Sequence, residues 1–161
     1  DLDECQALST RIRTDSWGKG EKAYYPRGLI QQELAKYTPA VLDSYTGRID
    51  RFAKVATDGR KIVGVAIGKC ERDTGVADIG WIGVAPEKQG KGVAKDLLES
   101  TFEHCRKAGC HKVIAYTFDA LEGANRMYSK YGFTKEADMP DHWMRMHFVM
   151  YARILEERDK R

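Results

Sequence analysis

The feature that most constrains the fold is a strand that passes into a helix across two glycines. The apolar run Val76–Val84 predicts a strand, and apolar residues at helical spacing between Val93 and Cys105 predict an amphipathic helix. Gly109 stops this helix, and the apolar strand Lys112–Phe118 follows. Strand, helix and strand in this order predict a βαβ unit, in which two parallel strands are joined by a helix.

The segment before this unit predicts antiparallel strands. Asp58 and Gly59 lie between two apolar runs, and this dipeptide at such a place is a strong hairpin signal. A turn at residues 73–75 leads into the next strand, so we expect a meander. The whole pattern predicts an α/β (α+β) fold with a mixed, mostly antiparallel sheet flanked by helices. The other expected elements are helices at residues 1–13, 29–37 and 122–131, a loop at 14–28, a helical turn after Pro39 and a last strand at 145–155.

Length and composition suit a single domain over residues 1–161. The formal net charge of +3 is scattered along the chain, which does not predict a nucleic-acid partner. No apolar run approaches the roughly 18 residues of a membrane span. The four cysteines form no CxxC pair and no zinc spacing, so we expect reduced, mostly buried thiols, no metal and a cytoplasmic location.

The glycine junction itself predicts an anion site. The first turn of a helix leaves backbone N–H groups unpaired, the helix dipole adds about half a positive charge, and glycine has no Cβ atom to hold an anion away. A Walker loop and a complete GxGxxG fingerprint are both absent. A tight turn without a ligand is the alternative. The residues expected around a phosphate or pyrophosphate are Gln89, Gly90, Lys91, Gly92, Val93 and Ala94.

The sequence around the junction reads Ile82-x-Val84-x-Pro86, three residues, QGKGVA, a helix, a strand and then ANRMYSKYGF. In this order it resembles motifs A and B of the GNAT superfamily, which comprises acyl-CoA-dependent N-acetyltransferases; the specific part is residues 78–133. The segment DLDECQALS looks like the first helix of that family, which normally follows a first strand. We therefore expect that strand to lie upstream of Asp1 and to be absent from this chain.

The resemblance implies transfer of an acetyl group from acetyl-CoA to the primary amine of a small-molecule or peptide acceptor, by direct attack in a ternary complex. It implies that the strand carrying Val84 splays from the next parallel strand. The junction would hold the pyrophosphate, and the pantetheine arm would bond the main chain at Ile82 and Val84. The Val84 N–H would polarise the thioester carbonyl. Asn125 would bond the pantetheine amides, although the family often carries that asparagine at the position of Leu121.

Two glycines inside the strand, Gly80 and Gly83, predict a bulge or the close approach of another backbone. For Gly83 the alternative is simple packing under Trp81.

The resemblance also implies a general acid, Tyr128, because a phenol with a pKa of about 10 can protonate the departing thiolate. Packing beside Met127 and Tyr131 is the alternative role of this tyrosine. Asp78 is our candidate for the base that takes a proton from the acceptor ammonium. The alternative carboxylates are Glu71, Asp73 and Asp119.

Two segments rich in aromatic and charged residues, 17–27 and 138–147, predict the wall of an acceptor groove, since loops often carry specificity. Their mixed charges do not choose among a peptide, a polyamine, an amino acid and an aminoglycoside. The residues expected to line the groove are Tyr24, Tyr25, Asp141, His142 and Trp143, and His142 is a further candidate base.

Two rival functions stay open, a non-catalytic acyl-CoA-binding or sensing module and a different phosphate-ligand enzyme such as a nucleotide binder. A homodimer also stays open.

Overall fold

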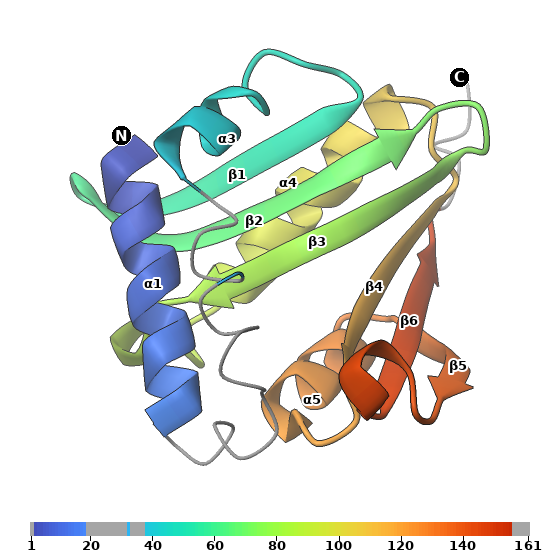
Figure 1. The fold of residues 1–161 in the computed structure, drawn as a ribbon. Coiled ribbons are helices and arrows are strands. Elements are labelled where there is room, and N and C mark those ends of the chain that lie inside the picture. The colour runs from blue at the N-terminus through green and yellow to red at the C-terminus, as the bar shows by residue number, and fades with distance from the viewer. Residues whose placement is uncertain (1, 19–31, 33–37, 156–161) are drawn as a thin grey trace.

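A mixed sheet of six strands forms the centre of the structure, a computed structural model that describes residues 2–18, 32 and 38–155, with 15–18 as backbone alone (Figure 1). The strand order is β1-β2-β3-β4-β6-β5, and β3 and β4 form the parallel pair. This confirms the predicted mixed, mostly antiparallel sheet. The predicted Asp58-Gly59 hairpin joins β1 to β2, with Gly59 at φ +61°. The strands are β1 (Arg51–Asp58), β2 (Lys61–Glu71), β3 (Val76–Val84), β4 (Lys112–Phe118), β5 (Thr134–Met139) and β6 (Phe148–Ile154).

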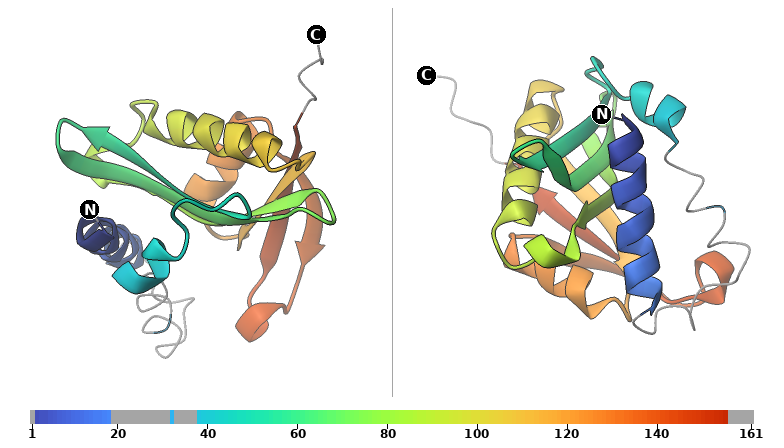
Figure 2. Two further views of the ribbon diagram at one scale, coloured as in Figure 1. Left: turned by 90° about the horizontal axis from the view of Figure 1, so that it is seen from above. Right: turned by 90° about the vertical axis from the view of Figure 1, so that its left-hand side faces the viewer.

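Helices cover both faces of this sheet (Figure 2). α1 (Leu2–Gly18) and α3 (Pro39–Asp43) lie on one face, while α4 (Val93–Lys107) and α5 (Glu122–Lys130) lie on the other. α1 continues to Gly18, so the loop expected from residue 14 is wrong at its start; no proline or glycine interrupts residues 14–17. Except for residue 32, the helix expected at 29–37 lies outside the described residues.

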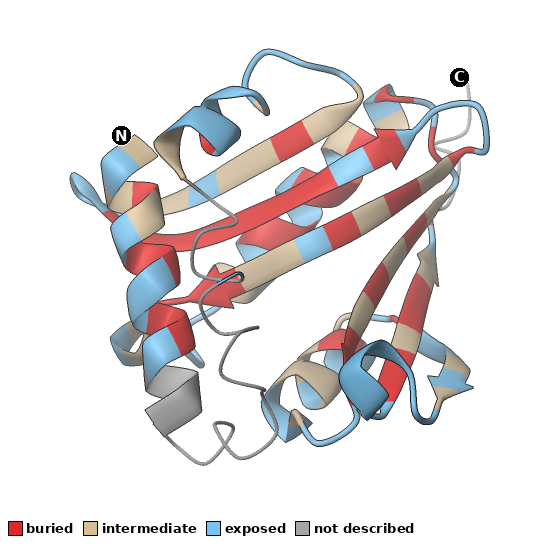
Figure 3. Ribbon diagram, in the orientation of Figure 1, coloured by how far each residue is buried: buried red, intermediate tan, exposed pale blue. Residues whose placement is uncertain are grey.

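Two apolar clusters hold the helices to the sheet. Cys5, Leu8 and Ile12 of α1 pack against β2 on one face. Leu98 and Phe102 of α4 pack against β3 and β4 on the other face. Because both of its faces are covered, β2 is buried along nearly its whole length (Figure 3). Each large apolar side chain buried in this way contributes roughly 1.5–3 kcal/mol to folding.

The four cysteines are free and buried, as predicted. Within residues 2–18, 32 and 38–155, no helix is long and apolar enough to cross a membrane. The same residues include no group of three His, Cys, Asp or Glu side chains that could hold a metal ion.

The sequence pattern does not predict β5. Its residues, TKEADM, are mostly polar and exposed because β5 is an edge strand that pairs with β6 alone, so no apolar alternation marks it. The start of β6 also differs from the expectation. It begins at Phe148 rather than at residue 145, because Met144 and Arg145 have φ angles of +55° and +60°, which a strand does not accommodate.

Candidate active site

A β-bulge in β3 marks the middle of the candidate site. The register of β2 and β3 passes from Ile67 opposite Trp81 to Gly68 opposite Ile79, which leaves Gly80 as the extra residue. A bulge bends its strand and increases the local twist. The bulge predicted for Gly80 is therefore confirmed.

β3 and β4 diverge beyond the bulge (Figure 1). They pair only where residues 76–79 lie beside residues 112–115, and residues 80–84 of β3 have no partner in β4. Backbone N–H and C=O groups alternate in direction along a strand. Some polar backbone groups of residues 80–84 therefore face the space that β4 leaves. This geometry is the splayed parallel pair that the family resemblance implies.

The glycine junction lies between the end of β3 and the start of α4. It consists of a short 3-10 turn, Pro86–Lys88, followed by Gly90 and Gly92 at φ +74° and +88°. Both glycines are required by these left-handed φ angles. A Cβ atom added to either one would meet no heavy atom within 4 Å, so the junction is open on that side.

The backbone N–H groups of the junction lack protein acceptors. Asp96 N–H donates to Gly92 O at 3.1 Å, which is the first intrahelical bond of α4. Within the described residues, no group accepts a hydrogen bond from the amides of residues 90–95, and Gly92 supplies no side-chain cap. A run of free amides at the positive end of a 15-residue helix is a site for an anion such as a phosphate.

Gln89 takes a different place from the one expected. Its backbone N–H donates to Pro86 O at 3.3 Å, and its side-chain amide donates to Val84 O at 3.2 Å. Both donors therefore close the turn between β3 and the glycines. In this structure Gln89 braces the junction, and the free amides begin at Gly90.

Positive charge dominates the surroundings of the junction. Lys88 forms an ion pair with Asp58, and this hydrogen bond, with the charges of Lys88, Lys91 and Lys61, holds the pKa of Asp58 below its usual value. Glu87, the acidic residue of the turn, is paired with Arg11 at 3.1 Å. Exposed pairs of this kind add little stability, but they compensate the nearby negative charges and leave Lys91 exposed at the junction.

The end of β3 presents different side chains to the two faces of the sheet. Ile82 and Val84 pack with Leu97 beneath α4. On the α1 side, a Cβ atom on Gly83 would come within 2.5 Å of the Trp81 ring, so this glycine makes room for the indole. Packing under Trp81, the alternative for Gly83, is thus what the structure shows.

The structure brings the proposed acid and base together. Tyr128 is only 4% exposed and stacks on Tyr151, with ring centroids 5.5 Å apart. Burial raises its pKa, and the negative charge of Asp78 raises it further. Asp78 lies half-buried on β3, one position before the end of the pairing with β4. Both effects raise the pKa of Tyr128, so this phenol keeps its proton at neutral pH.

Comparison with known proteins agrees with this geometry. Residues 12–133 match the sequence model of the Acetyltransferase (GNAT) family. The chain belongs to this family. Over 63 residues it is 32% identical to the mycothiol acetyltransferase of Thermobispora bispora, a match that spans 39% of this chain and 21% of that protein.

Solved structures share the GNAT fold of this chain. A PaiA N-acetyltransferase of Thermoplasma acidophilum, solved with coenzyme A, has a TM-score of 0.77 at 19% identity and covers 96% of this chain and 92% of its own. A Bacillus anthracis protein in complex with acetyl coenzyme A has a TM-score of 0.68 at 17% identity, over 72% and 69% of the two chains. At these identities the likeness concerns the fold.

In this GNAT chain Asn125 ties β4 to α5. Its Nδ2 group lies 3.1, 2.8 and 3.0 Å from the carbonyl oxygens of Phe118, Asp119 and Leu121. Its Oδ1 atom is buried, and no described group donates a hydrogen bond to it. The amide donors thus serve the fold, and Oδ1 is the atom left to accept an N–H group.

The alternative bases lie elsewhere in the GNAT domain. Glu71 and Asp73 are exposed at the turn from β2 to β3, at the paired end of β3 and away from the divergence. Asp119 follows β4 and lies 3.8 Å from Lys135 and 4.0 Å from His147. Of the four carboxylates weighed, Asp78 is the one whose charge acts on Tyr128.

Only part of the proposed wall of the acceptor groove lies within the described residues. Tyr24 and Tyr25 lie outside the described residues. Trp143 is 55% exposed, and its ring centroid lies 4.8 Å from that of His142, 5.0 Å from Phe148 and 5.7 Å from Tyr116. Asp141 is engaged with Arg145 at 3.3 Å.

Sequence reasoning missed Tyr116 and Phe148 as partners of Trp143. The sequence shows that both residues are aromatic and lie in apolar strands. It does not show that these strands, β4 and β6, are neighbours in the sheet.

Proposed function

We propose that this chain is an N-acetyltransferase that moves the acetyl group of acetyl-CoA to the primary amine of a small-molecule or peptide acceptor. The observation that carries the proposal is the row of amides at residues 90–95, which have no acceptor among the described residues and lie beside diverging strands. The amides suit a diphosphate, and the edge of residues 80–84 that β4 leaves unpaired suits the amides of a pantetheine arm. The two features are adjacent in the chain, as one extended ligand requires.

Different residues of the site bind different parts of acetyl-CoA. The amides from Gly90 to Ala94 hold the diphosphate, with Lys91 adding charge and Gln89 bracing the loop. The main chain at Ile82 and Val84 bonds the pantetheine arm, and Asn125 Oδ1 accepts one of its N–H groups. The Val84 N–H polarises the thioester carbonyl, an interaction that strengthens as negative charge develops on oxygen.

Asp78 and Tyr128 then move the protons. Asp78 takes a proton from the acceptor ammonium, and the free amine attacks the carbonyl carbon in a ternary complex. The C–N bond forms, the C–S bond breaks, and the thiolate receives the phenolic proton of Tyr128. The nitrogen of the new amide then loses its second proton to the Tyr128 phenolate, and Asp78 releases the first proton to solvent, so both side chains return to their starting states. A buried thiolate also has a raised pKa, so burial of Tyr128 does not by itself oppose this transfer.

A glycine pair on α4 provides a matched test of the donor site. Gly92 and Gly109 lie beyond the two ends of the helix at φ +88° and +87°, and a Cβ atom on either meets nothing within 4 Å. Gly92→Ala and Gly109→Ala therefore carry similar backbone strain, of about 1–2 kcal/mol. By calorimetry, we expect Gly92→Ala to weaken binding of coenzyme A at least tenfold and Gly109→Ala to bind as the wild type does. Equal affinities in the two variants, or no heat with the wild type, would refute the donor site.

Turnover requires a separate measurement. Acetyl-CoA consumption should be followed against pooled amines, peptides and aminoglycosides. Consumption with one pool supports the transferase. Tight binding of coenzyme A without consumption in any pool instead supports a non-catalytic acyl-CoA-binding module.

A further inference from the structure

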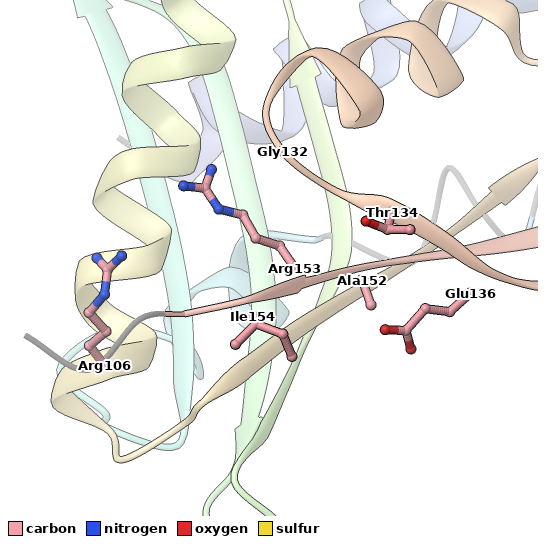
Figure 4. Close-up of a pocket in the computed structure, with 7 residues that line it drawn as sticks. All are labelled: Arg106, Gly132, Thr134, Glu136, Ala152, Arg153 and Ile154. Carbon is pink, nitrogen blue, oxygen red and sulfur yellow. The ribbon is translucent and has the colours of Figure 1, made fainter.

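A polar pocket lies at the opposite end of α4 from the glycine junction (Figure 4). Its volume is about 430 Å³. An α-helix rises about 1.5 Å per residue, so Arg106 lies roughly 20 Å from Val93 at the junction. The pocket is therefore separate from the proposed donor site. The residues that line it are Arg106, Gly132, Thr134, Glu136, Ala152, Arg153 and Ile154.

Arg106 brings an unused donor to this pocket. Its Nε atom is shielded from solvent, and no described residue accepts a hydrogen bond from it. None of the ion pairs formed within the described residues includes Arg106 either. Buried donors in folded proteins are normally satisfied, so this Nε atom at the edge of a cavity is a donor that an anion in the cavity can use.

Arg153 is held in place by the core. Its Nη1 donates to Tyr131 O at 2.6 Å, and its guanidinium carbon lies 4.4 Å from the centroid of the Phe102 ring. These contacts fix the planar group and leave its other N–H groups available. Figure 4 shows Arg106 on α4 and Arg153 on β6 with their guanidinium groups toward the same space. A pair of oriented guanidinium groups suits the oxygens of a phosphate.

The charges around the pocket favour an anion. Glu136, the acidic residue of the lining, is paired with Lys112. The carbonyl end of α4 is also satisfied, since the amides of Ala108 and Gly109 donate to His104 O and Arg106 O at 2.9 and 3.0 Å. The positive charges of the two arginines are therefore not offset within the lining, because its one carboxylate is already compensated.

We propose that this pocket binds a small phosphomonoester. The phosphate lies between the guanidinium groups of Arg106 and Arg153. The body of the ligand occupies the rest of the pocket. A volume of about 430 Å³ is in the range of metabolite sites and exceeds what a bare phosphate fills. The site is independent of acetyl transfer and does not rest on that function.

Calorimetry with the full chain tests the pocket, with glucose 6-phosphate as the probe and coenzyme A present at saturation. We expect binding of glucose 6-phosphate, weaker binding of inorganic phosphate and no heat with glucose. Arg106→Gln should weaken the affinity for glucose 6-phosphate at least tenfold, and it should fold normally because Arg106 has no partner among the described residues to lose. Arg126→Gln is the matched control, since Arg126 is an exposed arginine on α5 that pairs with Glu122.

Four outcomes overturn the proposal. They are no heat with glucose 6-phosphate, equal heat with glucose, equal weakening in the two arginine variants, and binding of glucose 6-phosphate only in a parallel titration without coenzyme A. The last result would place the phosphate at the glycine junction instead.

Discussion

At the scale of single residues, the effect of the Asp78 charge on Tyr128 is the most informative feature of the site. The phenol is buried against Tyr151 and Phe133, with ring centroids 5.5 and 5.2 Å away. The negative charge of Asp78 also raises its pKa. A tyrosine in such a place could be simple core. Packing in the core explains the aromatic ring of Tyr128 but does not explain its hydroxyl group.

Tyr128→Phe separates these two roles. It removes the hydroxyl and keeps the ring, so the stability should change little while kcat falls about 10²–10⁴-fold, the usual worth of a general acid. Affinity for coenzyme A should stay the same. Tyr131→Phe, one turn along the same segment, is the control and should retain full turnover. Wild-type kcat for Tyr128→Phe at every pH from 6 to 10 would show that the tyrosine is only a packing residue.

Gln89 and Asn125 show what the sequence could not predict at this scale. Gln89 was assigned to the ligand from its place at the glycine junction, and Asn125 from the family resemblance. In the structure their donors go to backbone carbonyls of the same turns, at 2.8–3.3 Å. Which acceptor an amide finds depends on loop geometry, and residue type and spacing do not fix that geometry.

At the scale of elements, the sequence predicts the helices and strands whose apolar residues recur at regular spacing, and it does not predict those without such spacing. α4 has its apolar residues on one stripe, and the Asp58-Gly59 turn is fixed by local chemistry, so both follow from the sequence alone. β5 has neither signal, because an exposed edge strand needs no apolar face. The divergence of β3 and β4 was inferred from family resemblance, and the structure adds its local companion, the bulge at Gly80.

Gly68, opposite that bulge, gives a prediction for the sheet. A Cβ atom there would lie 2.2 Å from Asp78 O and 2.2 Å from the Phe52 ring, so Gly68→Ala must displace backbone or core. We expect a loss of about 1–3 kcal/mol in the free energy of unfolding, measured by urea denaturation. Gly123→Ala on α5 is the counterpart, since its Cβ meets nothing within 4 Å; it should gain a few tenths of a kcal/mol or more. A Gly68→Ala variant as stable as the wild type would mean that β2 and β3 are not packed as described.

At the scale of the whole molecule, α4 connects two functional proposals. Its amino end carries the free amides and its carboxyl end carries Arg106, with a fully buried stripe of Leu97, Leu98 and Phe102 between them. The stripe fixes the helix against the sheet, so the two ends keep a constant separation. Thiol and phenol groups are buried in the same core, so the stability of the domain depends on pH.

Stability of the whole domain should decrease in alkali. Burial raises the pKa of Cys110 to about 12 from 9.0, and it also raises that of Tyr128. Between these values the unfolded chain has lost protons that the folded chain still binds, so the free energy of unfolding falls as pH rises, by up to about 1.4 kcal/mol per pH unit and group. The Cys70 thiol opposes the trend, because a hydrogen bond with Cys105 lowers its pKa, but Cys5 and Cys105 are raised and add to it.

Urea denaturation under reducing conditions at constant ionic strength measures this effect. Between pH 8.5 and pH 10.5 we expect the free energy of unfolding to fall by more than about 1 kcal/mol. Cys110→Ala removes one of the titrating protons, so its curve should decline less steeply than that of the wild type, whatever its stability at pH 7. Parallel curves for the two proteins would mean that Cys110 exchanges its proton as freely in the folded chain as in the unfolded one, and that the core around α4 admits solvent.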